Sequence, residues 1–172
     1  MSRRLCQIAK VVQCVAPIDA TAGAQQAANI NMAKYDHVSF IIGMGNFTND
    51  TIITMNYATG TLIAGVAMGF SYYVSSAHAA LVTVVDSAAL TTVGVGGYTP
   101  ANATDDNMCI VVEVSAQELR TVVDAAAAAA TNTYVGMRFS APGGTCLIYC
   151  VAVCQWNRYE ADPNLMPNPI AA

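Results

Sequence analysis

Apolar and polar residues alternate along residues 37–42, and this alternation predicts a β-strand. Val38, Phe40 and Ile42 fall on one side of the strand, because successive side chains point to opposite faces. A second strand is predicted over residues 51–57. The intervening GMGNFTND has the composition of a turn, so the two strands form either a hairpin or a connection that crosses between sheets.

Short apolar runs separated by turn residues continue along the rest of the chain. They predict extended segments over residues 11–18, 62–74, 79–85, 108–114, 134–140 and 146–156. Residues 93–107 are rich in Gly, Pro, Asn and Asp and predict a loop, and APGG at 141–144 predicts a turn. Seven or eight short strands at such intervals indicate an all-β sandwich or barrel.

One helix interrupts the β pattern. Ser115 and Glu118 have the spacing of a capping box, in which each side chain bonds the other residue's backbone N–H. Six consecutive alanines follow soon after, and alanine is the best helix former. We therefore expect one short helix near residues 116–130. The domain plan is an N-terminal arm (residues 1–30), a β-domain (31–160) and an extended, proline-rich tail (161–172).

The composition is unusual for a dispersed soluble protein. Of 172 residues, 55% are hydrophobic and only 10% are charged, against roughly 25% charged in typical globular domains. Between Thr51 and Thr104 the only formal charge is Asp86. Such a stretch indicates burial in a core, in a bilayer or against protein neighbours.

The sequence disfavours the bilayer, and it also disfavours nucleic acid as a direct partner. Residues 58–85 are uncharged and long enough to span a bilayer, but polar residues dilute them and no Lys or Arg cluster flanks them. We therefore expect no membrane insertion, and no targeting segment is visible. The net charge of −4 and the lack of a basic stripe argue against direct nucleic-acid binding.

The chain lacks a recognisable arrangement of catalytic or metal-binding residues. His37 and His78 have no Cys, Asp or Glu partners at ligand spacing. Asp105 and Asp106 do not form an EF-hand loop, so whether they bind a metal stays open. Glu113, Glu118 and Arg138 are expected to serve in helix capping and an ion pair. We predict a protein that is not an enzyme and has no cofactor or metal.

The six cysteines fit no zinc-ligand spacing. They are Cys6, Cys14, Cys109, Cys146, Cys150 and Cys154. The last three lie four residues apart and so share a face of a strand or helix. We expect small apolar core residues in a chain made in a reducing cytosol. A disulfide between two of them stays an open alternative.

Several segments, taken in order, resemble small capsid-decoration (cement) and head-associated proteins of tailed bacteriophages. KYDHVSFII at 34–42 resembles an early core strand of that group, and the strand at 51–57 is also expected there. DNMCIVVEVSAQEL at 106–119 is similar to a later strand with an acidic turn. YVGMR at 134–138, LIY at 147–149 and Arg158-Tyr159 resemble the closing strands. The chain departs from the pattern at Asp124 and residues 125–130.

The resemblance implies a jelly-roll-like β-sandwich on the outside of an icosahedral head. It further implies binding to the major capsid protein, often as a homotrimer, with synthesis in the host cytoplasm and a final place on the virion exterior. An apolar surface is tolerable when subunits cover it. Phe70, Tyr72 and Tyr73 are the candidate subunit contacts, with ordinary core residues as the alternative.

Two other interpretations stay open. One is a different structural role in the virion, such as a head fibre base, a tail component or a minor coat protein. The other is a carbohydrate-binding jelly roll that adheres to the host, which requires exposed aromatic side chains and a polar cleft.

Overall fold

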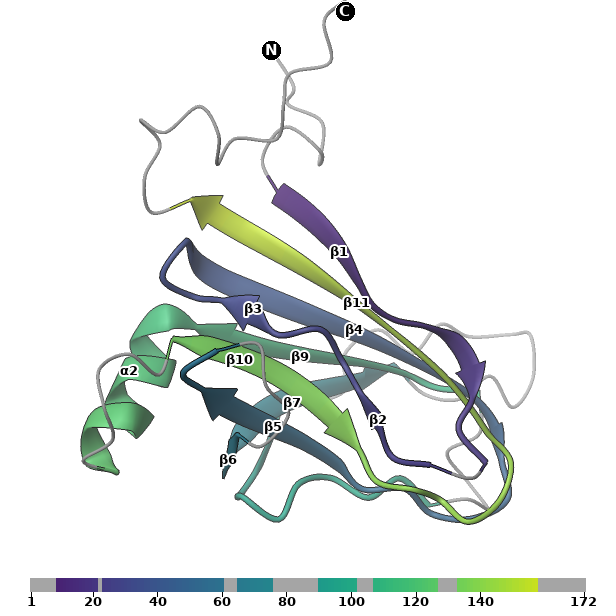
Figure 1. The fold of residues 1–172 in the computed structure, drawn as a ribbon. Coiled ribbons are helices and arrows are strands. Elements are labelled where there is room, and N and C mark those ends of the chain that lie inside the picture. The colour runs from purple at the N-terminus through teal and green to yellow at the C-terminus, as the bar shows by residue number, and fades with distance from the viewer. Residues whose placement is uncertain are drawn as a thin grey trace, which may run out of the picture.

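A computed structural model describes residues 9–21, 23–60, 65–75, 90–101, 107–126 and 133–157. Two antiparallel β-sheets pack face to face, with the single described helix at one end (Figure 1). Three predicted features lie outside these residues: the strand at 79–85, the Asp105–Asp106 pair and the tail at 161–172. The expected all-β sandwich with one short helix is confirmed for the described residues.

The larger sheet has six strands in the spatial order β1, β11, β4, β9, β7, β8. Their bounds are β1 (Ala9–Asp19), β11 (Cys146–Asn157), β4 (Tyr35–Phe47), β9 (Cys109–Ser115), β7 (Phe70–Ser75) and β8 (Thr91–Val93). In the five-stranded sheet, β2 (Gln25–Gln26) and β3 (Ile30–Asn31) both pair with β10 (Tyr134–Phe139). The sheet continues through β5 (Ile53–Ala58) to β6 (Val66–Met68).

The order of the strands is that of a jelly roll. Strands from the first half of the chain pair with strands from the second half: β1 with β11, β2 and β3 with β10, and β4 with β9. The short pair β5–β6 closes this series. The arrangement is a long antiparallel hairpin folded across two sheets, and β7 and β8 extend the larger sheet beyond β9.

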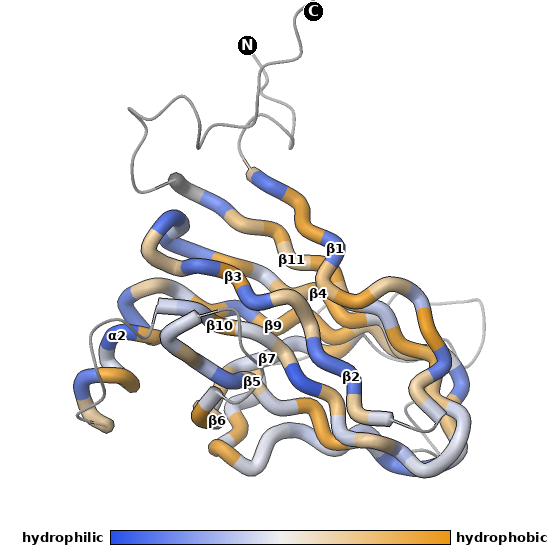
Figure 2. The backbone as a smooth tube through the Cα atoms, in the orientation of Figure 1, coloured by the Kyte–Doolittle hydropathy of each residue, from blue (hydrophilic) through white to orange (hydrophobic). Residues whose placement is uncertain are grey.

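The core lies between the sheets and follows the two-residue period of the strands. Val38, Phe40 and Ile42 on β4 have no exposed surface. Met55 on β5 and Met137 on β10 face them from the other sheet and are equally buried. Hydrophobic segments accordingly line the interior strands in Figure 2. Alternation therefore supplies one apolar face per sheet, and the two faces form the core.

The turn predicted at GMGNFTND is shorter than expected, because β4 continues through Phe47. Gly43 pairs with Tyr149 and Met44 with Ile148 on β11, so both positions belong to the sheet ladder. Phe47 and Met44 are buried and hold this end of the strand in the core. β4 and β5 lie in different sheets, so their connection crosses the sandwich rather than forming a hairpin.

The predicted arm over residues 1–30 also needs correction. Residues 9–19 form β1, which pairs with β11 from Ala9 opposite Gln155 to Asp19 opposite Leu147. Residues 25–26 and 30–31 pair with β10 in the other sheet. The physical reason is that Cys14, Val15 and Ile30 are buried in the common core. The sandwich therefore includes β1, β2 and β3, and residues 1–8 lie outside the part of the chain that the structure describes.

The helix α2 (Ala116–Ala125) begins with the predicted capping box. The Glu118 backbone N–H donates to Ser115 Oγ at 3.1 Å, and the Ser115 N–H donates to Glu118 Oε2 at 2.7 Å. Leu119 and Val123, one turn apart, are buried. On the exposed side of the helix, Arg120 Nε lies 3.7 Å from Asp124 Oδ2. Residues 127–130 of the predicted helix fall outside the described range.

Replacing Ser115 with alanine is expected to lower the free energy of unfolding by about 1 kcal/mol. The substitution removes the oxygen that accepts from the Glu118 N–H, which leaves that N–H to water. Chemical denaturation of the two proteins measures the difference. Gln117→Ala, at an exposed position of the same turn, is the control and should cause no loss. Equal losses in both variants would contradict the capping role.

Candidate functional site

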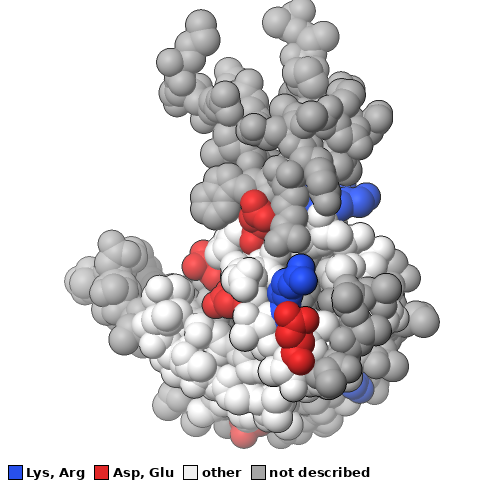
Figure 3. Space-filling view, turned by 90° about the vertical axis from the view of Figure 1, so that its left-hand side faces the viewer, with Lys and Arg blue, Asp and Glu red and all other residues white. Residues whose placement is uncertain are grey.

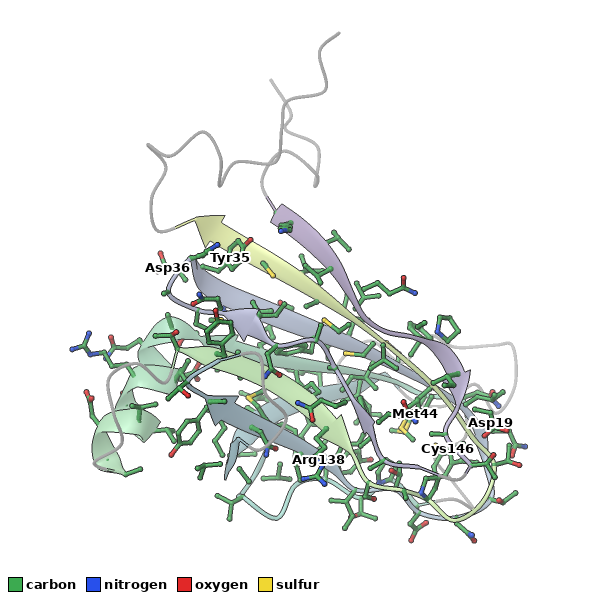
Figure 4. The ribbon with its side chains drawn as sticks, viewed as in Figure 1. Asp19, Tyr35, Asp36, Met44, Arg138 and Cys146 are labelled. Atoms are coloured by element: carbon green, nitrogen blue, oxygen red, sulfur yellow. The ribbon has the colours of Figure 1, made fainter. Side chains whose placement is uncertain are left out.

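The outer faces of the two sheets differ in polarity. On the five-stranded sheet, Thr54, Asn56, Tyr134 and Arg138 point away from the core. The Asn56 side-chain amide donates to the Gly65 carbonyl at 2.8 Å, and Figure 4 places Arg138 on the β10 side of the molecule. This face has the polar character expected of a solvated sheet.

The outer face of the six-stranded sheet carries a row of apolar side chains across its four middle strands. Val151 on β11 lies opposite Ile41 on β4, Ile41 lies opposite Val111 on β9, and Val111 lies opposite Tyr73 on β7. We call these four side chains the apolar row. Strands are about 4.8 Å apart, so the row runs about 15 Å across four strands. Within the described part of the chain no second layer of secondary structure covers it.

Further apolar side chains extend the row along the strands. Val11 on the edge strand β1 is 53% exposed, and Leu147 and Tyr149 on β11 are 48% and 41% exposed. From Val151 to Leu147 the outward β11 residues that keep exposed surface cover about 14 Å, at about 3.4 Å per residue. The outer face therefore presents a continuous apolar band, whereas isolated exposed apolar residues would be ordinary.

A groove of about 650 Å³ opens at one end of the band, between β1, β11, β4 and the start of β9. Tyr149 lies across Gly43, where any side chain would overlap the tyrosine ring. Gly45 is similar, since a Cβ there would come within 2.9 Å of Leu147 Cβ. The two glycines let both β11 side chains lean over β4. Gly43 and Gly45 of the GMG motif therefore shape the groove. The turn-like composition of the motif did not predict this role.

The opposite end of the band is polar. Ser39 Oγ donates to Glu113 Oε1 at 3.2 Å, and His37 Nε2 lies 3.7 Å from the same oxygen. Glu113 therefore pairs with His37, and Glu118 caps α2 as predicted. The His37–Glu113 pair is partly exposed and resembles a surface contact rather than a catalytic arrangement.

Beside the groove, Asp19 ties the end of β1 to the start of β11. Its Oδ1 accepts from Thr21 Oγ1 at 2.6 Å and from the Cys146 N–H at 3.0 Å. These hydrogen bonds, the Thr21 hydroxyl foremost, lower the pKa of Asp19 below its ordinary value of 3.8. Figure 4 shows Asp19 and Cys146 together at this end of the sandwich, with Tyr35 and Asp36 at the other.

The lowered pKa predicts a pH-dependent effect of Asp19→Asn. A carboxyl group whose pKa falls on folding stabilises the protein above its unfolded pKa, and this contribution disappears as pH drops through the folded pKa. The melting temperature of wild type should therefore exceed that of Asp19→Asn at pH 7, and the difference should shrink below about pH 4. Thermal unfolding at pH 7 and pH 2.5 measures this. A difference that persists unchanged at pH 2.5 contradicts the role assigned to the charge.

The structure separates the three aromatic residues predicted as subunit contacts. Phe70 and Tyr72 are 5% and 7% exposed and belong to the core, where Tyr72 packs against Tyr98 with ring centroids 4.5 Å apart. Both side chains point from β7 into the core, so they are not available as contacts on this surface. The Tyr73 side chain points outward, is 40% exposed and forms the β7 end of the apolar row.

The described cysteines confirm the expectation of buried apolar residues in most cases. Cys14, Cys146, Cys150 and Cys154 are buried thiols of the core, and the last three share the inward face of β11. Burial raises the pKa of Cys154 to about 11 and also raises that of Cys146. Cys109 is partly exposed on the outer face. Cys6 falls outside the described residues.

Formal charges are few on the surface seen in Figure 3, which views the molecule from the α2 end. Several acidic side chains and a basic one lie near the centre of this view, and a few other charged side chains lie at its right edge and at the bottom. In the described ranges, no set of three or more His, Cys, Asp or Glu side chains is placed to hold a metal ion. No helix in those ranges is long and apolar enough to cross a membrane.

The site that emerges from the described residues is the apolar row on the outer face of the six-stranded sheet, with the groove at one end. Comparison of the chain with protein-family models, with curated proteins and with solved structures gives no match.

Proposed function

We propose that this chain is a structural protein of a tailed-phage particle that binds the outside of the capsid lattice and stabilises the head. Its partner is the major capsid protein, and it assembles as a homotrimer. It is made in the host cytoplasm and resides on the virion exterior. The proposal assigns no enzymatic step and requires no cofactor.

The observation that carries the proposal is the apolar row of Val151, Ile41, Val111 and Tyr73. An apolar band on the outer face of an antiparallel sheet is favourable only where another surface covers it, since that face is usually solvated. The polar outer face of the five-stranded sheet provides the contrast within the same molecule. We therefore assign the capsid contact to the six-stranded sheet.

The size of the band suits attachment in multiple copies. A patch of about 15 by 14 Å is the apolar centre of an interface, whereas stable pairs bury about 800 Å² on each partner. A polar rim contributes the rest, and Glu113 with His37 begins one such rim. A trimer would attach to the capsid more tightly than a monomer. Once one subunit is bound, the linked subunits bind at a high effective concentration. Jelly rolls also occur in viral capsid domains, which is an analogy of fold only.

The test compares particles that contain the chain with particles that lack it. We expect the chain to copurify with intact heads, and heads without it to rupture at lower temperature or under milder osmotic shock. Light scattering of the purified protein should give the mass of a trimer. Absence from particles, or heads of unchanged resistance, would overturn the proposal. Recovery with tails or fibres would instead support another structural role in the virion.

A second candidate is carbohydrate binding at the groove. Tyr149 is 41% exposed beside the groove and lies flat over Gly43, and Asp19 and Asn107 contribute polar groups to the lining. An aromatic face with nearby polar groups suits a sugar ring, and lectins also use jelly rolls. A glycan-binding screen with wild type and Tyr149→Ala decides this. Binding that depends on Tyr149 supports it, and no bound glycan rejects it.

A further inference from the structure

Two buried cysteines face each other across the pair β1–β11. The pairing changes register between Gln13, which lies opposite Val151, and Val15, which lies opposite Cys150. Cys14 is the extra residue of this β-bulge. Cys14 and Val15 are both buried, so the bulge turns two successive side chains toward the core. Cys14 is thereby placed beside Cys150, whose side chain also faces the core.

The register favours Cys150 over the other β11 cysteines as the neighbour of Cys14. Cys154 lies opposite Lys10, four residues further along β11, which is about 13 Å away along the strand. Cys146 is equally far in the other direction. Disulfides require Cα atoms about 4.4–6.8 Å apart. Val15, the residue opposite Cys150, lies about 4.5–5.5 Å from it across the strand pair, and Cys14 precedes Val15 in the bulge and is buried on the same side.

The two thiols also contact each other. A hydrogen bond from Cys150 lowers the pKa of Cys14, and the same contact together with burial raises the pKa of Cys150. Cys14 is therefore the more readily ionised member of the pair and the better attacking group. Cys14 lies on the edge strand β1, whose register shifts twice, so local opening of this strand gives a reagent access to it.

We propose that Cys14 and Cys150 are a disulfide-forming pair that fastens the edge strand β1 to β11 when the protein meets a small-molecule disulfide. The Cys14 thiolate attacks a sulfur of oxidised glutathione and expels one glutathione thiolate. The deprotonated Cys150 sulfur then attacks Cys14 Sγ, and the second glutathione leaves. The two cysteine sulfurs lose two electrons and two protons, and oxidised glutathione becomes two molecules of glutathione.

The inference goes beyond the proposed function, because it concerns the two thiols whether or not the chain binds a capsid. A chain made in a reducing cytosol keeps both thiols, whereas a particle outside the cell meets oxidising conditions. The bond closes a loop that runs along the chain from residue 14 to residue 150, and long loops give the larger stabilisation in the chain-entropy model.

Mass spectrometry of the full-length protein tests the pairing directly. The protein is incubated with oxidised glutathione, its remaining thiols are blocked with N-ethylmaleimide, and it is digested without reduction. We expect a cross-linked peptide that joins Cys14 to Cys150, and its loss after dithiothreitol. Separate blocked peptides for the two cysteines, or a cross-link to another cysteine in place of this one, would overturn the proposal.

Thermal unfolding supplies a second measurement. Oxidation should raise the melting temperature of wild type by roughly 5–10 °C, and dithiothreitol should reverse the rise. Cys14→Ala and Cys150→Ser should each abolish the rise. Cys154→Ala, at a buried position of the same strand face, is the matched control and should retain it. An unchanged melting temperature in oxidised wild type would contradict formation of the bond. If a variant does not fold, the cross-link analysis of wild type still tests the proposal.

Discussion

Replacing Val151 with glutamate is expected to weaken attachment of the protein to heads by 100-fold or more. Val151 lies at the β11 end of the apolar row, between Ile41 on β4 and Gln13 on the edge strand β1. A carboxylate buried there against a capsid surface would lose water without gaining a partner, which costs several kcal/mol. Each tenfold loss of affinity corresponds to about 1.4 kcal/mol. The measurement adds purified protein to heads that lack it and follows the amount that sediments with them.

The matched control is Thr54→Glu on the outer face of the five-stranded sheet. Thr54 is also half-buried and outward-facing on a central strand, and it pairs with Arg138. Thr54→Glu should bind heads like wild type, and both variants should keep melting temperatures near that of wild type, because neither side chain enters the core. If Thr54→Glu loses binding while Val151→Glu retains it, the docking face is the other sheet.

Replacing Phe40 with alanine is expected to cost about 3–5 kcal/mol of unfolding free energy. Phe40 has no exposed surface, and it pairs with Ala152 on one side and Val112 on the other, in the middle of the six-stranded sheet. The small neighbour Ala152 cannot fill the cavity that removal of the ring leaves. For a chain of this length the loss lowers the melting temperature by roughly 6–20 °C, as calorimetry would measure.

Ile41→Ala is the comparison for Phe40→Ala, because Ile41 is the next residue and points to the opposite face. Its loss should be well below that of Phe40→Ala, since Ile41 is only half-buried. Phe40→Leu should recover most of the stability and serves where the alanine variant does not fold. Equal losses at positions 40 and 41 would contradict the assignment of the inner and outer faces.

Short-range sequence patterns predicted the elements whose formation depends on residues close together in the chain. The alternation at Val38, Phe40 and Ile42 identified the core face of β4, because the two-residue period needs no knowledge of the partner strand. The capping box at Ser115 and Glu118 likewise involves atoms three residues apart. The spacing of the cysteines at 146, 150 and 154 correctly placed them on one face of a strand.

Features that depend on distant partners were missed. Gly43 and Gly45 have turn-like composition, but Gly43 pairs with Tyr149 on β11, and the Tyr149 and Leu147 side chains lie over the two glycines. The chain before residue 31 has small residues typical of an arm, yet its pairing with β11 and β10 makes it part of both sheets. Pairing energy from strands more than a hundred residues away outweighed these local preferences.

The sequence by itself determined the all-β class, the position of the helix start and the low surface charge, because each follows from residue type and short-range periodicity. Only the tertiary structure decided which apolar residues are core and which are surface. Tyr72 and Tyr73 are adjacent and identical in type, and the pairing of β7 with β9 turns one inward and the other outward. Likewise the bulge in β1 decides that Cys14 meets Cys150. A strand has two faces, and only the packing of a second sheet against one of them makes that face the interior.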